Sequence, residues 1–152
     1  MILGRYFKIF MDKPAEEVAE KEATERKDFL EKKVTEVSSL NIYDREFLNR
    51  ISICMEENMS DDTYWVDDLS FDMNTSRSTF FRKLKKLTGY APKDYMRNTR
   101  LLRAGELLEK GQLRIAEVSY QVGFSDPNYF SKCFRRFYGT SPSDYSVLSS
   151  AS

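Results

Sequence analysis

Histidine is missing from this chain of 152 residues, and its absence removes several classes of function at once. Without histidine there is no Ser-His-Asp or Cys-His catalysis, no histidine-ligated zinc and no histidine pH switch. The two cysteines, Cys54 and Cys133, are far apart and form no C-x-x-C pair, so neither a metal knuckle nor a disulfide framework is indicated. We therefore expect no catalytic residues, no metal, no cofactor and two reduced thiols in a cytoplasmic protein.

Glycine and long apolar runs are also scarce. The six glycines form neither G-x-x-x-x-G-K-[ST] nor G-x-G-x-x-G, so the sequence offers no loop for a nucleotide phosphate. No stretch approaches 18 consecutive apolar residues, so no transmembrane helix is expected. The 41% of hydrophobic residues and 14% of aromatic residues are nevertheless ample for a packed core, which excludes global disorder.

The formal net charge of zero conceals an uneven distribution of charge. Between Arg77 and Arg103 there are nine basic residues against Asp94 alone. A basic strip in a neutral protein favours a polyanionic partner on one face. A solvated helix face explains a run of charge equally well when nothing else supports a partner.

Residues 1–43 are interpreted as an N-terminal helical arm or linker. Residues 15–33 contain neither glycine nor proline, and the apolar positions of this region recur at helical spacing: Ala19, Ala23, Leu30, Val34 and Val37. A stripe this thin buries little, so the arm is either a connector to a signalling module or a weak homodimer contact. Residues 37–43 are predicted to form a short linker, and Asp44 to cap a helix that ends near Met59.

The second half of the chain contains an internal repeat, which is its most informative feature. At an offset of 50 residues the two copies share aromatic, glycine, proline and acidic positions: Phe80 and Phe130, Gly89 and Gly139, Pro92 and Pro142, Asp94 and Asp144, Tyr95 and Tyr145. Each copy indicates two helices joined by a short turn, with a cationic outer face on the second helix. This is the plan of a helix-turn-helix.

Glycine, proline and capping residues predict where the helices begin and end. The first helix-turn-helix is placed at about 66–89, a long linker helix at about 92–109, and the second helix-turn-helix at about 114–139. Gly123 permits the sharp turn of the second copy, either Ser125 or Asp126 caps its second helix, and Gly139 ends that helix. The predicted fold class is all-α: two helix-turn-helix subdomains joined by a long linker helix, with an N-terminal helical arm.

Residues 44–148 resemble the AraC-type DNA-binding domain. The resemblance rests on SRSTFFRKLKKLTGYAP at 76–92, RLLRAGELL at 100–108 and VSYQVGFSDPNYFSKCFRRFYGTSPSDY at 118–145. Residues 44–59, taken with the first of these strings, are similar to the output domains of bacterial hybrid two-component regulators. The resemblance implies a transcription regulator that reads two successive major grooves of double-stranded DNA, with RNA polymerase as a further candidate partner.

The resemblance also implies which side chains meet DNA. The outward positions that face bases in the family are Ser78, Thr79, Phe81 and Arg82 in the first recognition helix, and Asn128, Tyr129 and Lys132 in the second. Arginine or lysine can read guanine, asparagine can read adenine, and threonine or phenylalanine can touch the thymine methyl. Phosphate contacts are expected from Ser76, Lys85, Lys86, Ser125, Ser131, Arg135 and Arg136. Phosphate contact stays open as the alternative for Arg82, and stacking on its own helix as the alternative for Tyr129.

Two departures from the family pattern bear on these expectations. Ser70 and Ser119 stand where the family usually has alanine, and we expect each buried hydroxyl to bond the carbonyl four residues back. The first turn has Asn74-Thr75 where the family prefers glycine, which makes the first subdomain the less certain reader. The alternative function is a helical protein-interaction module that keeps the fold without binding DNA, and the basic strip argues against it.

Overall fold

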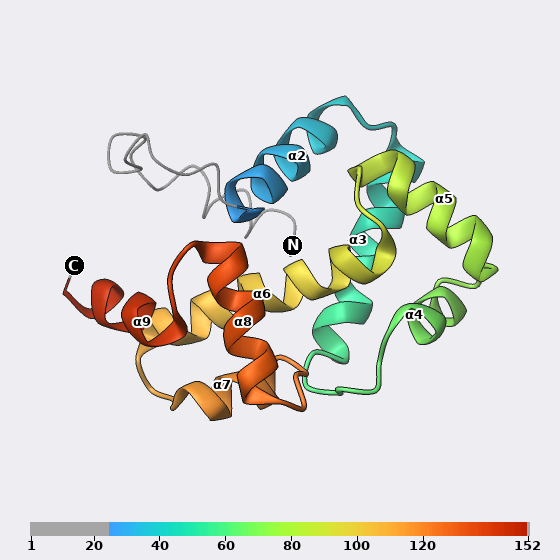
Figure 1. Ribbon diagram of the computed structural model, residues 1–152. Helices are drawn as coiled ribbons and strands as arrows, with labels where there is room; N and C mark the ends of the chain where they lie inside the picture. Colours follow the sequence, from blue (N-terminus) through green and yellow to red (C-terminus); the bar gives the residue numbers. More distant parts are fainter. Residues whose placement is uncertain (1–24, 152) are drawn as a thin grey trace.

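The computed structural model describes residues 25–151, and within that range the chain is helical and contains no strand, which confirms the all-α fold class. The helices are α2 (Glu25–Ser39), α3 (Ile42–Glu57), α4 (Val66–Asp72), α5 (Arg77–Thr88), α6 (Pro92–Lys110), α7 (Ile115–Gln121), α8 (Pro127–Tyr138) and α9 (Pro142–Ser150). The long helix α6 runs through the middle, with α3, α4 and α5 at one end and α7, α8 and α9 at the other (Figure 1). None of the helices described is long and apolar enough to cross a membrane.

The predicted repeat is present as two helix-turn-helix units, α4–α5 and α7–α8. The second helix of each unit begins at a side-chain cap: Ser76 accepts the backbone N–H of Thr79, and Asp126 accepts that of Asn128. Each helix ends at a glycine in the left-handed region, as the sequence predicts. Of the two caps considered for α8, the structure selects Asp126.

The turns of the two units adopt the same left-handed backbone conformation with different residues. Asn74 adopts a φ of 58° in the first turn and Gly123 a φ of 80° in the second. Asparagine therefore replaces glycine without changing the turn. The serine hydroxyls differ from expectation, because Ser70 and Ser119 each donate to the carbonyl three residues back rather than four, at 2.9 and 2.8 Å. Both carbonyls lie within reach of a helical serine, so the hydroxyls are satisfied inside their own helices.

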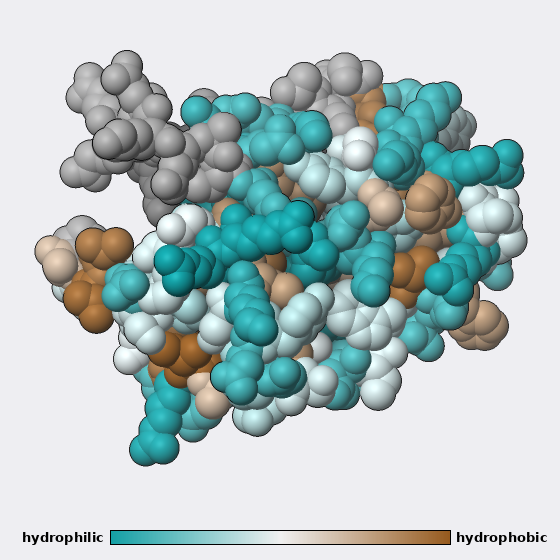
Figure 2. Space-filling model, viewed as in Figure 1, coloured by the Kyte–Doolittle hydropathy of each residue, from teal (hydrophilic) through white to brown (hydrophobic). Residues whose placement is uncertain are grey.

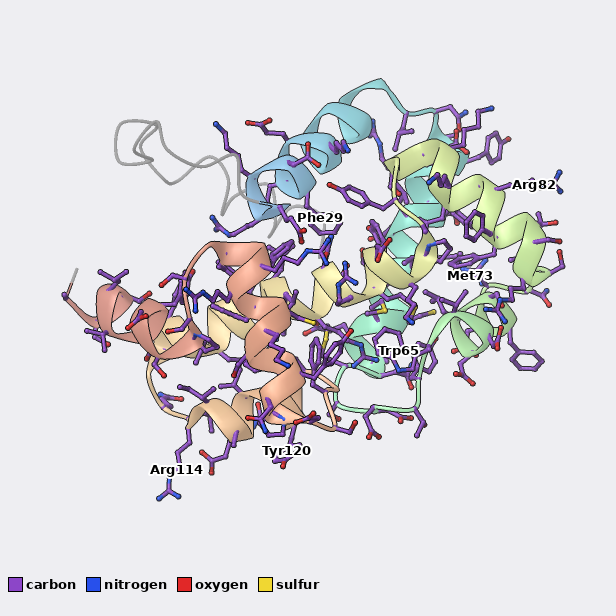
Figure 3. The ribbon with its side chains drawn as sticks, viewed as in Figure 1. Phe29, Trp65, Met73, Arg82, Arg114 and Tyr120 are labelled. Atoms are coloured by element: carbon purple, nitrogen blue, oxygen red, sulfur yellow. The ribbon has the colours of Figure 1, made fainter. Side chains whose placement is uncertain are left out.

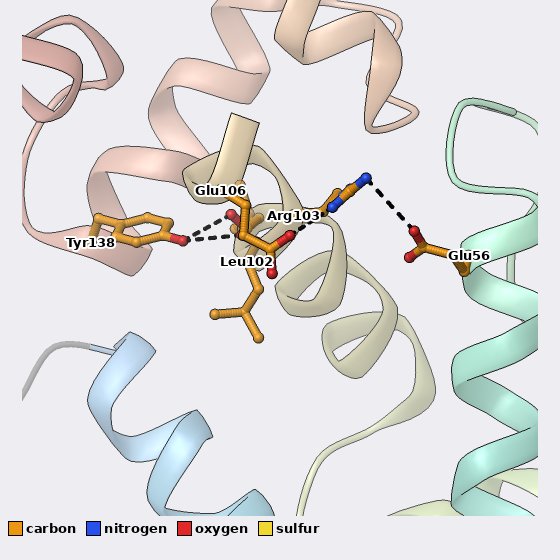
Figure 4. A network of polar contacts seen from close by, with 6 residues as sticks. Glu56, Leu102, Arg103, Glu106 and Tyr138 are labelled. Carbon is orange, nitrogen blue, oxygen red and sulfur yellow. Dashed lines mark hydrogen bonds and ion pairs between the residues drawn. The ribbon is translucent and has the colours of Figure 1, made fainter. Parts of the chain in front are cut away.

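Helix α6 packs most extensively against α9 and also contacts α8. The predicted stripe of Leu101, Ala104, Gly105 and Leu108 is buried. The Tyr138 hydroxyl of α8 donates to the Leu101 carbonyl at 3.1 Å (Figure 4). This approach requires glycine at position 105, because a Cβ on Gly105 would lie 2.1 Å from the Tyr138 hydroxyl oxygen. On the other side, Arg103 pairs with Glu56 of α3 at 3.7 Å.

The start of α3 differs from the sequence prediction. Asn41 caps the helix instead of Asp44: its side chain accepts the Asp44 N–H at 2.9 Å and donates to the Asp44 carboxylate at 3.0 Å. This reciprocal pairing places the acidic residue in the first turn, where it also favours the helix dipole. The linker expected at residues 37–43 shrinks to Leu40 and Asn41, because α2 continues to Ser39.

The largest departure is the packing of α2. Phe29, which the thin stripe of small residues did not include, is fully buried, and its neighbour Leu30 is nearly so. Helix α2 contacts α5, α6 and α8. One large aromatic side chain can bury more area than several alanines, so counting apolar positions underestimated this helix. The predicted stripe residues Ala19 and Ala23 lie outside the described residues.

The turn at Gly123 should be the least tolerant glycine position in the molecule. A Cβ at Gly123 would lie 1.5 Å from Nη1 of Arg100 and 2.6 Å from the Met59 carbonyl oxygen, whereas nothing lies within 4 Å of one at Gly111. Both glycines have positive φ, so Gly111→Ala should cost only the backbone strain, about 1–2 kcal/mol. We expect Gly123→Ala to lower the free energy of unfolding by more than about 3 kcal/mol in urea titrations followed by circular dichroism. Equal losses in the two variants would contradict the packing described here.

Candidate nucleic-acid interface

The two recognition helices separate structural from solvent-facing side chains by helix face. Their inner faces are buried, through Phe80 and Leu84 in α5 and Phe130, Phe134 and Phe137 in α8. All seven positions expected to face bases are exposed: Ser78, Thr79, Phe81, Arg82, Asn128, Tyr129 and Lys132. Arg82 extends from α5 away from the body of the molecule (Figure 3). Side chains with this placement are available to a partner without any rearrangement of the core.

The cationic side chains expected to contact phosphates fall into two groups. Lys85, Lys86 and Arg135 are exposed and form no ion pair with any residue in the described range. Arg136 is also exposed, but its Nε donates to the Glu25 carboxylate of α2 at 2.5 Å. This pairing raises the pKa of Arg136, so the guanidinium stays charged. The group on α8 is therefore partly engaged by α2.

The three serines expected at phosphates differ in what their hydroxyls already do. Ser76 accepts the Thr79 N–H and donates to the Thr79 side-chain oxygen at 2.9 Å. Ser131 is half-buried and donates to the Pro127 carbonyl at 2.9 Å. A phosphate needs a donated hydrogen, so either serine would give up an internal bond to meet one. Ser125 is exposed and keeps its hydroxyl free of such a bond among the residues described.

A hollow of about 490 Å³ lies between the N-terminal turns of the two recognition helices. Arg77 of α5 and Tyr129 of α8 line it from either side, and Lys93 and Arg97 of α6 line it between them. Sequence reasoning missed Arg77, Lys93 and Arg97 as site residues, although it counted them in the basic strip. The signal was there, because positions 93 and 97 lie one turn apart on one face of the linker helix.

Two of the cations beside the hollow are paired locally. Arg77 lies 2.9 Å from Asp67, and Arg97 lies 3.1 Å from Asp94, one turn back on its own helix. Lys93 is exposed and has no ion pair within the described part of the chain. The hollow is thus lined by charges of both signs, because Asp67 and Asp68 face it together with the three cations.

Tyr129 packs on a ring of its own unit, and its contact with a base stays a prediction. Its ring lies 6.1 Å from that of Phe124, so the ring packs on its own subdomain. Half of the residue is nevertheless exposed, and its hydroxyl interacts with Cys133 and Arg97, the Cys133 hydrogen bond raising the pKa of Tyr129. The hydroxyl therefore points to the hollow between the subdomains.

Arg100, which the sequence analysis counted in the basic strip, does not lie on the surface. It is fully buried, and its guanidinium donates to backbone carbonyls rather than facing solvent. Arg103 is mostly covered and pairs with Glu56 and Glu106. The cationic surface therefore consists of α5, α8 and the first two turns of α6. The face drawn in Figure 2 is largely hydrophilic, with small and separate hydrophobic patches.

Residues 69–146 match the family model described as a helix-turn-helix domain. The chain belongs to the AraC-type helix-turn-helix family. The AraC-type chain is 36% identical to Histidine kinase P4 of Formosa agariphila over 107 residues, and 35% identical to the HTH-type transcriptional activator RhaS of Escherichia coli over 97 residues. These matches cover 70% and 64% of the chain, but only 8% and 34% of the two relatives.

Two solved structures extend the comparison. The C-terminal domain of the two-component response regulator yesN from Fusobacterium nucleatum has a TM-score of 0.59 and 31% identity, and the match covers 63% of this chain and 93% of that domain. The DNA-binding domain of AdpA, solved in complex with a target DNA, has a TM-score of 0.63 and 32% identity. That match covers 68% of this chain and 93% of the AdpA domain. The AraC-type chain therefore shares its family and fold with the helix-turn-helix domains of DNA-binding transcription regulators.

The cap of α8 gives a direct stability test of the second recognition helix. Asp126→Ala removes the acceptor of the Asn128 N–H and should lower the free energy of unfolding by about 1 kcal/mol. Ser125→Ala, one residue earlier and exposed, should change it by less than about 0.5 kcal/mol. Chemical denaturation of both variants measures the difference, and a larger loss in Ser125→Ala would mean that the wrong residue has been assigned as the cap.

Proposed function

We propose that the chain is a sequence-specific regulator of transcription that places α5 and α8 in two successive major grooves of double-stranded DNA. The observation that carries the proposal is the pair of recognition helices, each with a buried aromatic face and an exposed polar and cationic face. The DNA complex of the AdpA domain and the activator RhaS support the same role. No feature of the described residues favours the alternative of a protein-interaction module.

The dimensions of the linker helix suit two-groove reading. Helix α6 has 19 residues and therefore spans about 28 Å at about 1.5 Å per residue. With the width of the two subdomains added, it can hold the recognition helices about 34 Å apart, which is one turn of B-DNA. DNA that does not follow this spacing would have to bend, at a cost of a few kcal/mol. Lys93 and Arg97, which line the hollow between the recognition helices, would then lie near the phosphates between the two grooves.

The side chains on the two outer faces differ, so the two DNA elements should differ as well. Arg82 and Lys132 are proposed to read guanine, Asn128 to read adenine, and Thr79 and Phe81 to contact thymine methyl groups. Ser78 and Tyr129 complete the base-facing positions. Phosphate contacts are assigned to Lys85, Lys86, Arg135 and Arg136, with the three serines Ser76, Ser125 and Ser131 as further candidates. The combined site is non-palindromic.

The remaining proposals concern partners and the arm. RNA polymerase stays a candidate partner for a regulator of this type. Self-association through the N-terminal arm gains no support from α2, because Phe29 and Leu30 are buried within the chain. The division into an arm at 1–43 and a DNA-binding domain at 44–148 also stays a proposal, and α2 packs against that domain.

Base readers and phosphate contacts can be separated by substitution. Arg82→Ala should weaken binding to the best site by about 1–3 kcal/mol and relax the preference at one base pair. Lys86→Ala, one turn further along the same helix, should weaken binding to all duplexes about equally and reduce the salt slope by about one. Fluorescence anisotropy with a panel of single-base variants at several salt concentrations measures both. If Arg82→Ala behaves as Lys86→Ala does, Arg82 contacts phosphate instead of a base.

The two-groove proposal is tested by changing the spacing of the DNA elements. Duplexes selected from a random pool should contain two elements with centres about 10–10.5 base pairs apart. Inserting five base pairs moves the elements to opposite faces of the duplex, so binding should fall to that of a single element. An inserted site that binds as tightly as the parent would show that only one helix-turn-helix reads DNA.

A further inference from the structure

Helix α2 lies outside the region matched by the family model, and the proposed function gives it no role. It nevertheless contacts both helix-turn-helix units, through α5 on one side and α8 on the other, as well as the linker helix α6. Figure 1 shows it lying across the gap between the two ends of the molecule. A helix in this position connects two units that are otherwise joined through α6.

Phe29 provides the apolar part of this connection (Figure 3). Its ring is fully buried and meets three other rings edge-on: Tyr90 at 5.2 Å, Tyr95 at 5.6 Å and Phe137 at 5.9 Å. Tyr90 lies between α5 and α6, Tyr95 lies on α6, and Phe137 lies in the last turn of α8. One side chain of α2 thus touches the corner between α5 and α6, the linker helix and the second recognition helix.

Polar contacts hold the α2 helix at the first unit. The Tyr90 hydroxyl donates to the Asp28 carboxylate at 2.6 Å, and the Lys32 ammonium lies 4.7 Å from the centre of the Tyr90 ring. The Tyr90 hydrogen bond, followed by the Lys32 contact, lowers the pKa of Asp28. Three residues of α2 therefore hold Tyr90: Phe29 and Lys32 contact its ring, and Asp28 accepts its hydroxyl hydrogen.

A second group of contacts holds α2 at the second unit. The Arg26 guanidinium lies 5.2 Å from the centre of the Tyr138 ring, and the Glu25 carboxylate pairs with Arg136. Both partners are in the last turn of α8. Glu25 and Arg26, at the start of α2, thus contact the C-terminal end of α8. Asp28 and Lys32, further along α2, contact Tyr90 at the corner after α5.

We propose that α2 is a positioning strap: Phe29 fixes the separation and tilt of the two recognition helices, and the docked helix thereby sets the spacing of DNA elements that the chain accepts. The proposal rests on two-groove reading. Without α2, the orientation of α5 relative to α8 depends on α6 and on the packing at each of its ends. The contacts of α2 add a further attachment between the two units and restrict hinge and twist motions of α5 relative to α8. The free protein is therefore preorganised and loses less conformational freedom on binding.

Phe29→Ala tests the strap against a graded series of duplexes. The series keeps both elements and varies their spacing by one, two and three base pairs from the optimum, with a single-element duplex as reference. The wild-type chain should show a sharp optimum. In Phe29→Ala, affinity at the optimum should fall about 5–30-fold, the spacing profile should flatten, and binding to the single element should stay within about twofold.

Leu48→Ala is the matched control. Leu48 is also a buried apolar side chain, but it lies on α3, which packs against α4 of the first unit, so its loss reduces stability without removing the bridge. It should weaken binding to all duplexes by the same factor and leave the spacing profile sharp. Phe29→Leu keeps apolar volume at the bridge and should restore most of the profile. If Phe29→Ala also leaves the profile sharp, or if it tightens binding, the strap is wrong.

A distance measurement separates the strap from the proposed function. Spin labels at Ser78→Cys and Asn128→Cys, with Cys54 and Cys133 replaced by serine, report the separation of α5 and α8 in the absence of DNA. The distribution should be narrow with Phe29 present and clearly broader in Phe29→Ala, while urea titrations confirm that both chains are folded. A broadened distribution in the labelled Phe29→Ala chain, combined with an unlabelled wild-type chain that binds no duplex, would leave the strap intact and overturn the DNA proposal. An unchanged distribution would overturn the strap whatever the chain binds.

Discussion

The buried guanidinium of Arg100 ties the entry to the first unit and the turn of the second unit to the linker helix α6. It donates to four backbone carbonyls at 2.5–3.1 Å: those of Met59, Asp61, Tyr64 and Val122. The first three precede α4, and the fourth ends α7, so one side chain of α6 closes the entry to the first unit and the turn of the second. Burial lowers the pKa of Arg100, yet the carbonyl dipoles and the Trp65 ring at 5.0 Å stabilise the charge without a paired carboxylate. Only a planar fork of donors can reach separate carbonyls in this way, so lysine is no substitute.

The position of Arg100 also explains why the two turns of the repeat differ in their residues. In the second turn the guanidinium lies where a side chain on Gly123 would be, so glycine is required for space as well as for its φ. In the first turn Asn74 has a similar φ but is exposed, and its side chain projects without obstruction. Asparagine satisfies the backbone requirement there, and no second requirement exists. The departure from the family pattern at Asn74-Thr75 therefore leaves the first recognition helix in the same frame as the second.

Sequence reasoning succeeded where the determinants are local. Proline at the first helical position and glycine after the last one predicted α6 to within one residue, and Gly139 predicted the end of α8, because these residues act on their own backbone. The outward positions of α5 and α8 came from the resemblance to the family, and all seven are exposed. It failed where the determinant is a distant partner. Arg100 meets carbonyls 22 to 41 residues away, and Phe29 meets Phe137 across more than half of the chain. No local pattern distinguishes such an arginine from a surface charge, or such a phenylalanine from an isolated apolar residue in a polar helix.

The separation of roles by helix face has a consequence for specificity. Because Phe80 and Phe130 hold each recognition helix from the inner side, the outward residues other than Tyr129 contribute little to packing and can differ between the units without changing the fold. On α8, Arg136 also has a partner within the chain. Its guanidinium faces outward, where a phosphate would bind, yet it is held by Glu25 of the helix that bridges the units. A phosphate that approaches Arg136 must either share the guanidinium with that carboxylate or displace it, and solvent screens an exposed ion pair of this kind. The two contacts of α2 therefore differ in kind, because Phe29 is buried among other rings whereas the Arg136–Glu25 pair is exposed to solvent.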